Sequence, residues 1–287
     1  MAGALIAGCS ASHEDAASAE DAVNAGTCGL DPTKPASLRT LMLAPIVTPE
    51  DADTRFVCLA SMLRTQNDRR APFATLYSKI TSAVRQAILA GTFEDGPWVR
   101  TYLASFAELY RVAFVGYIDG RQGDVPASWR ISFDTARARK ELIVQDLSLG
   151  VNAHVDRDLS HALVRASIGA KGPVRDARRH DHFAVNDVLH AQLDAAVTTI
   201  AEDFAPGLGK APAELRALLE AAYFDALVVG RQKAWDDAVL LTDSPSFGRF
   251  LVSEEIELSS EALAKAILLP SLDPALFAAL KALEGSN

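Results

Sequence analysis

The chain has 287 residues, of which 49% are hydrophobic and 23% charged, so it can bury a full core in one large domain or two small ones. Its formal net charge is −9, and no cluster of lysine and arginine builds a basic face, which argues against nucleic acid as a partner. No apolar run approaches the roughly 18 residues of a membrane span. We therefore expect a soluble body.

Residues 1–28 predict a tether ahead of the folded part. The run Ile6-Ala7-Gly8-Cys9 is similar to a bacterial lipobox, in which signal cleavage exposes a cysteine for lipid attachment, although the basic start and full apolar stretch of a secretory signal are missing. Ser10 to Gly26 is mostly Ala, Ser, Asp and Glu, a composition that cannot bury enough surface to fold. We expect a disordered linker, a location in the cell envelope or outside the cell, and membrane attachment only through lipidated Cys9. A disordered tail on a cytoplasmic protein is the alternative.

The three cysteines, Cys9, Cys28 and Cys58, lie in the first fifth of the chain without a Cys-x-x-Cys pair, which disfavours a thiolate zinc site or a redox dithiol. In an exported protein, Cys28 and Cys58 can form a disulfide. That bridge would hold residues 29–49 against the first helix and stabilise the fold by about 3 kcal/mol in the chain-entropy model. Two buried free thiols are the alternative.

From Thr48 onward the signals are helical. Thr48-Pro49-Glu50-Asp51 combines a capping hydroxyl, proline in the first turn and acids at the positive end of the helix dipole. No run of alternating apolar and polar residues bounded by turns indicates a strand. We therefore expect an all-α fold, with one bundle-like domain over residues 29–287. Apolar spacing predicts a first helix that begins at Thr48 and further helices over 72–91, 97–118, 126–147, 183–203, 213–241, 257–267 and 273–284. The helix over 126–147 is expected to continue into the histidine motif described below.

The sharpest chemical signal is histidine, because five of the six histidines lie between His154 and His190. Residues three or four apart share one face of a helix. His154, Asp158 and His161 therefore become neighbours on one helix, and His182, Asn186 and His190 become neighbours on a later one.

Two such faces on packed helices could hold a divalent metal, as in other helical bundles. Imidazole and carboxylate ligands suit zinc, which lowers the pKa of bound water toward about 7 and so supplies a hydroxide nucleophile. We take His154, Asp158 and His182 as candidate metal ligands. The resulting hypothesis is a metal-assisted or His/Asp acid–base hydrolase of a small or lipid-like substrate, with His154, Asp158 and Asp181 as the catalytic residues.

Two further interpretations stay open. In one, the chain is a non-catalytic binding protein, anchored at the cell envelope, whose buried polar cluster recognises a small or lipid-like ligand. In the other, His154 is a core histidine that Asp158 satisfies, with no ligand at all. Trp235 fits a core position, and Arg231 fits a solvated or acid-paired one. The candidate substrate-binding residues are Asn152, Asn186, Arg231 and Trp235.

The His154-x-x-x-Asp158 spacing is similar to a motif of the helical zinc phospholipase C and S1/P1 nuclease superfamily. Those enzymes continue with a proline and with a histidine six residues after the aspartate, where this chain has Val164. They also use an N-terminal tryptophan as a ligand, and no tryptophan precedes Trp98. The resemblance therefore implies one metal ion at most.

Four local patterns together resemble the bacterial proteins grouped as domain of unknown function 5995. They are Arg70-Ala-Pro72-Phe73 with Tyr77 and Thr81, Leu149 to His154 with Asp158-Leu159, Asp181 to Asn186, and Arg231 with Ala234-Trp235. These patterns span residues 70–240, most of the expected folded part. The resemblance implies a helical domain and no specific activity. It groups Asn152, His154, Asp158, Asp181, Asn186, Arg231 and Trp235 as residues that matter together.

Overall fold

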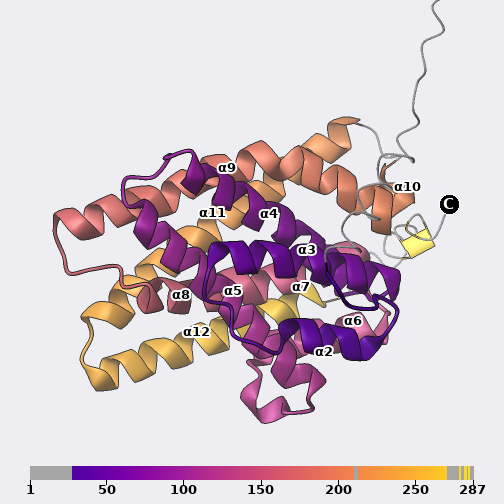
Figure 1. The fold of residues 1–287 in the computed structure, drawn as a ribbon, viewed down its shortest axis with the longest axis horizontal. Coiled ribbons are helices and arrows are strands. Elements are labelled where there is room, and N and C mark those ends of the chain that lie inside the picture. The colour runs from indigo at the N-terminus through magenta and orange to yellow at the C-terminus, as the bar shows by residue number, and fades with distance from the viewer. Residues whose placement is uncertain (1–27, 210–212, 270–277, 279–280, 283, 285–287) are drawn as a thin grey trace, which may run out of the picture.

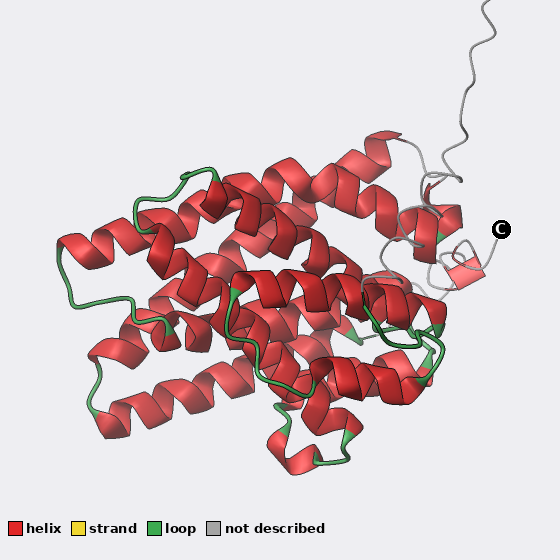
Figure 2. Ribbon diagram, in the orientation of Figure 1, coloured by secondary structure: helices red, strands yellow, loops and turns green. Residues whose placement is uncertain are grey.

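The computed structural model describes residues 28–209, 213–269, 278, 281–282 and 284, and throughout this part of the chain the elements are helices, with no strand (Figure 2). The predicted all-α fold class is confirmed. The N-terminal tether, with the lipobox-like run and Cys9, lies outside the described residues. The elements are α2 (Pro35–Met42), α3 (Pro49–Thr65), α4 (Ala71–Leu89), α5 (Gly96–Ile118), η1 (Gln122–Asp124), α6 (Ala127–Ala138), α7 (Ile143–Asn152), η2 (Ala153–Asp158), α8 (Leu159–Arg165), α9 (Pro173–Phe204), α10 (Pro206–Gly209), α11 (Ala213–Asp243) and α12 (Ser246–Ile267).

Local sequence explains where two of the central helices begin. The Thr48 hydroxyl accepts a hydrogen bond from the backbone N–H of Asp51 at 3.1 Å, as the capping pattern predicts. Asp95 does the same for the backbone N–H of Trp98 at 3.1 Å, ahead of α5. In both helices a proline occupies the first turn, where its missing N–H costs no hydrogen bond.

The prediction of one helix from Pro126 into the histidine motif is wrong. The chain leaves the helix at Arg139, which has a left-handed φ of +57°, and α7 starts afresh at Ile143. A left-handed residue ends a helix because it turns the backbone away from the helix axis. Apolar spacing alone missed this break because Phe133, Ala136 and Ile143 continue the same helical stripe.

Two other helices are longer than predicted. Helix α9 begins at Pro173 rather than residue 183, after Gly172 at a φ of +131°. Helix α12 begins at Ser246 rather than residue 257. Both extensions are rich in polar or exposed side chains, so they carry little of the apolar period on which the prediction depended. The helix predicted over 273–284 falls almost entirely outside the described residues.

The long helices α9 and α11 pack against each other and run along the long axis of the molecule (Figure 1). Helix α4 packs on α9, and α3 packs on α4, while α11 also contacts η2 and α8. The core where α5 meets α6 is aromatic: the Trp129 ring lies 5.1 Å from both Tyr110 and Phe133. Among the described residues, we find no helix that has both the length and the hydrophobicity to cross a membrane.

Gly150 allows α7 to approach α4 closely. A Cβ at this position would lie 2.7 Å from the ring of Phe73, which is closer than real side-chain contacts allow. The absence of a side chain thus brings the start of η2, with His154, against the aromatic face of α4. The edge of the Phe73 ring packs against His154, with 5.6 Å between ring centroids.

Cys28 and Cys58 form a disulfide, with 5.7 Å between their Cα atoms. The predicted pairing is therefore confirmed. Cys58 is buried in α3, so the bridge fastens the segment that precedes α2 to the side of the bundle.

Candidate functional site

His154 and Asp158 lie in η2, a single π-helical turn between α7 and α8. Such turns are rare and expose backbone and side chains in positions that a regular α-helix does not reach, often at functional sites. Both side chains are buried, with exposed fractions of 2% for His154 and 0% for Asp158. A buried histidine and carboxylate must find partners in the protein or in a ligand.

The two side chains form a dyad. His154 Nδ1 lies 3.5 Å from Asp158 Oδ2, at the long end of hydrogen-bonding range. Asp158 also accepts hydrogen bonds from Trp129 Nε1 at 2.8 Å and from the Arg157 guanidinium at 2.6 Å. Burial by itself raises the pKa of Asp158, but its hydrogen bond with His154 and the charge of Arg157 outweigh burial and hold the pKa below its ordinary value. Asp158 is therefore ionised at neutral pH.

His154 is neutral at the same pH, because burial lowers the pKa of its imidazole more than Asp158 raises it. A neutral ring that donates from Nδ1 toward Asp158 keeps a lone pair on Nε2. That Nε2 atom is buried and has no hydrogen-bond partner among the described residues. The ring is held by Phe106, which stacks on it, and by Tyr77, whose ring meets it edge-on at 4.4 Å. Aromatic packing thus fixes a hydrogen-bond acceptor in place.

A cavity of about 60 Å³ adjoins His154, between α4, α5, η2, α9 and α11. At roughly 10–15 Å³ per water molecule, it has room for a few waters or for the head group of a larger ligand. Ile80 on α4 and Leu227 on α11 line it and are partly exposed, so the cavity lies near the surface there. Apart from aliphatic and phenylalanine side chains, the wall carries His154, Tyr77, Tyr102, Tyr223 and Arg231.

Arg231 is a buried cation on this wall, with 4% of its surface exposed. Its Nε donates to Asn186 Oδ1 at 2.6 Å, and its Nη1 donates to the Tyr102 hydroxyl at 3.3 Å. Its Nη2 donates to the backbone carbonyl of His182. These acceptors are all neutral, and no carboxylate of the described residues lies within ion-pair distance. Hydrogen bonds thus stabilise the positive charge of Arg231, but no carboxylate of the described residues neutralises it.

His182, Asn186 and Trp235 surround Arg231 and join α9 to α11. His182 Nε2 donates to the backbone carbonyl of Arg231 at 3.1 Å, and burial lowers the pKa of the ring well below its usual value. Trp235 is 2% exposed, and its ring lies 5.4 Å from that of His182. Of these four predicted site residues, Arg231 lines the cavity, and the other three hold Arg231 in position.

Asp181 and Asn152 lie away from the cavity wall. The carboxylate of Asp181 accepts the backbone N–H groups of Glu94 at 2.8 Å and Asp95 at 2.6 Å, in the loop before α5. Asn152 Nδ2 donates to the backbone carbonyl of Ser260 on α12 at 2.9 Å. Of the predicted catalytic residues, His154 alone is on the wall of this cavity, and both motif-bearing segments, η2 and α9, pack against α11.

The predicted metal ligands His154, Asp158 and His182 do not converge. Within the described ranges, no three His, Cys, Asp or Glu side chains are grouped closely enough to hold a metal ion. Asp158 is already bonded to a cationic guanidinium, which competes with a metal for the carboxylate. Zinc or another divalent metal at these residues stays a prediction that their geometry does not favour.

Sequence reasoning missed the three tyrosines of the cavity wall as site residues. Tyr77 belongs to one of the four patterns of the family resemblance, but no pattern in the sequence indicated Tyr102 or Tyr223. The hydroxyl of Tyr223 is buried and forms no hydrogen bond among the described residues. A tyrosine on an otherwise aliphatic stripe was the available clue, since its hydroxyl needs a partner once buried.

The outlying histidines differ in their surroundings. His180 is exposed, and its Nδ1 lies 3.0 Å from Glu94 Oε1. His190 is also exposed. His161 is half-buried, and burial lowers its pKa to about 4. None of the three lines the cavity beside His154.

Comparison with known proteins gives a family without an activity. A model described as "Family of unknown function (DUF5995)" matches residues 52–270. Searches of the curated proteins and of the solved structures found no match. The matched range contains the whole cavity and the dyad beside it.

Proposed function

The chain belongs to the family of unknown function DUF5995, which supplies no activity, and we propose from the site geometry that it binds a small or lipid-like carboxylic acid beside His154. The observation that carries the proposal is the buried guanidinium of Arg231, which has no carboxylate partner among the described residues and lies on an otherwise apolar cavity wall. Buried charges in proteins are almost always paired, because an unpaired one is costly. An anionic head group would complete the pair.

The other polar atoms of the wall fit the same head group. His154 Nε2 requires a hydrogen-bond donor, and the hydroxyl of Tyr223 has no partner in the part of the chain that the structure describes. A carboxylic acid fits both groups: its proton passes to His154 Nε2, which then donates to the carboxylate, and the carboxylate oxygens accept from Tyr223 and Arg231. Its hydrocarbon part would lie against the aliphatic wall toward Ile80 and Leu227. Few polar groups on an apolar wall are typical of small-molecule sites.

Butyrate and butyramide test this proposal, because they match in size and differ in charge and in acidity. We expect saturable binding of butyrate, at least about tenfold tighter than butyramide, since one charge-assisted hydrogen bond contributes roughly 1.5–3 kcal/mol. His154→Phe should remove most of that preference while keeping the ring packed on Phe106. Titration calorimetry, with NMR detection of the His154 ring, measures both effects.

Two further variants sharpen the test. Tyr223→Phe removes a hydroxyl with no partner among the described residues, so we expect weaker butyrate binding without loss of stability. His180→Phe changes an exposed histidine in the same way and should bind like the parent protein. Equal affinity for butyrate and butyramide, or an unchanged affinity in His154→Phe, would contradict the proposal.

A second candidate function, hydrolysis of a carboxylic ester, rests on the Asp158–His154 dyad. A neutral imidazole oriented by a carboxylate can act as a general base. His154 Nε2 would take a proton from water while the water oxygen bonds to the ester carbonyl carbon. The bond to the alcohol then breaks, and the alcohol leaves with the proton. The acid that remains is the ligand class proposed above.

Ester hydrolysis would be measured with 4-nitrophenyl butyrate. If His154 is the base, His154→Phe should lower the rate by about 10²–10⁴-fold, whereas His180→Phe should leave it unchanged. Treatment with a chelator separates the two forms of the hypothesis, because only a metal-assisted reaction would be lost and then restored by zinc. A parent protein no faster than His154→Phe would rule out this function and leave the binding proposal standing.

The Cys28–Cys58 disulfide supports a location outside the reducing cytoplasm. We therefore propose that the protein acts in the cell envelope or is secreted. Attachment to a membrane through lipidated Cys9 is part of the same proposal.

A further inference from the structure

A second cavity, of about 470 Å³, lies where the loop between α3 and α4 meets α6 and the end of α5. Its wall includes a single acid, Asp68, and the four arginines Arg69, Arg70, Arg137 and Arg139. The protein as a whole has a net charge of −9, so this concentration of guanidinium groups opposes the overall charge. Guanidinium groups recognise carboxylates and phosphates through paired hydrogen bonds. We call this cavity the arginine cleft.

Three of these arginines have a carboxylate partner, and for Arg137 it is Asp134, with 3.6 Å between Arg137 Nη2 and Asp134 Oδ1. The guanidinium of Arg69 donates to Asp146 Oδ2 at 2.6 Å. Arg70 donates to both oxygens of Asp68, at 2.9 and 2.6 Å. Arg70 nevertheless keeps one nitrogen, Nη1, that is buried and has no partner in the described part of the chain. Because Nη1 is buried and the guanidinium lies over the Phe114 ring, Arg70 contributes positive charge to the cleft wall and no free donor.

Arg139, by contrast, has only neutral hydrogen-bond acceptors among the described residues. Its guanidinium donates to the backbone carbonyl of Asn67 at 2.5 Å and contacts Asn67 Oδ1 at 3.3 Å, and both acceptors are neutral. Among the described residues no carboxylate lies within ion-pair distance of Arg139. A guanidinium held in place by neutral acceptors keeps its full charge for an anion.

The backbone of Arg139 supplies an independent observation. Three non-glycine residues of the described chain have a left-handed φ, and two of them line the arginine cleft: Asn67 at +52° and Arg139 at +57°. Asparagine tolerates this conformation, but an arginine carries a steric cost there, and glycine is the usual residue at such a helix end. Strained positions of this kind gather at functional sites. The position thus keeps an arginine where glycine would fit more easily.

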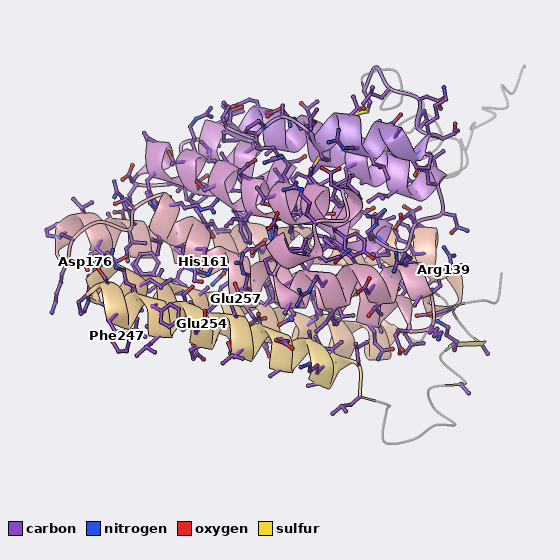
Figure 3. All side chains as sticks on the ribbon, turned by 90° about the horizontal axis from the view of Figure 1, so that it is seen from below. Arg139, His161, Asp176, Phe247, Glu254 and Glu257 are labelled. Atoms are coloured by element: carbon purple, nitrogen blue, oxygen red, sulfur yellow. A yellow bond between two sulfur atoms is a disulfide. The ribbon has the colours of Figure 1, made fainter. Side chains whose placement is uncertain are left out.

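We propose that the arginine cleft binds a small organic oxyanion, with a phosphate monoester as the first choice. Arg139 would donate to its oxygens beside the guanidinium of Arg70, and the rings of Phe133 and Tyr117 on the wall would contact its carbon part. This site is separate from the cavity beside His154, because the two share no lining residue. Figure 3 places Arg139 at one end of the molecule, opposite Phe247 and Asp176.

Arg139→Gly tests the proposal. Glycine relieves the left-handed strain, so the melting temperature should be no lower than that of the parent protein, while binding of phenyl phosphate weakens at least about tenfold. Inorganic phosphate should bind more weakly than phenyl phosphate, because it lacks the ring. Benzoate shows whether the cleft prefers a carboxylate to a phosphate. Binding is measured by titration calorimetry at low ionic strength.

Arg249→Ala is the matched control. It removes one positive charge from the first turn of α12, whose neighbour Phe247 lies at the far end of the molecule in Figure 3, and should bind phenyl phosphate like the parent. If Arg139 only connects α6 to the loop before α4, Arg139→Gly will have a lower melting temperature than the parent protein, and the parent protein itself will not bind phenyl phosphate. Absence of saturable binding for all three anions, or equal binding by Arg139→Gly, overturns the proposal.

Discussion

Replacement of Asp158 by alanine is expected to lower the free energy of unfolding by about 3–5 kcal/mol, the cost of breaking a buried ion pair from one side. The fully buried carboxylate accepts hydrogen bonds from Trp129 and Arg157 and faces His154. Without it, the Trp129 N–H is left buried and unpaired, and Arg157 keeps only Glu257 as a counter-ion. Chemical denaturation followed by circular dichroism measures the loss.

Asp158→Asn, measured in the same way, removes the negative charge of the side chain but keeps its size and shape. The amide oxygen can still accept from Trp129, so the loss should be smaller than for alanine. The folded protein lowers the pKa of Asp158 below its ordinary value of 3.8, so the ionised carboxylate stabilises the fold above that pH. That contribution disappears as the pH falls through the lowered folded-state pKa, and the parent and Asp158→Asn should then converge in stability.

Asp236→Ala is a suitable control, because Asp236 is an exposed acid on α11. Exposed substitutions usually change stability by less than about 0.5 kcal/mol. A loss below about 1 kcal/mol for Asp158→Ala would contradict the network described above.

Removal of the disulfide, by Cys28→Ser combined with Cys58→Ala, is expected to lower the free energy of unfolding by about 3–4 kcal/mol. The bridge closes a loop between residues 30 positions apart, and in the chain-entropy model most of its effect is to restrict the unfolded chain. Alanine is chosen at position 58 because Cys58 is 2% exposed, and a serine hydroxyl there would add the cost of a buried polar group. Denaturant unfolding with and without a reductant gives the value.

The reductant is the internal control for this prediction. It should destabilise the parent protein by a similar amount and leave the double variant unaffected. A parent protein whose stability does not respond to complete reduction would show that the bridge contributes little.

Local signals in the sequence were enough to identify the helical class and most of the helix positions. The cap at Thr48, the prolines in first turns and the period of apolar residues act within a few residues of chain, so they can be recognised without the fold. The same signals failed at Arg139 and before residue 183. In the first case a left-handed residue interrupts a continuous apolar stripe, and in the second a polar helix segment carries no stripe.

The sequence by itself determined the His154–Asp158 dyad, because two residues four apart on one helical segment meet wherever that segment packs. Only the tertiary structure decided what surrounds it. Three features depend on which helices pack together: the tyrosines of the cavity wall, the neutral hydrogen-bond acceptors around Arg231 and the use of Asp181 to hold the loop before α5. Such contacts join residues far apart in the chain, and no local pattern of side chains encodes them.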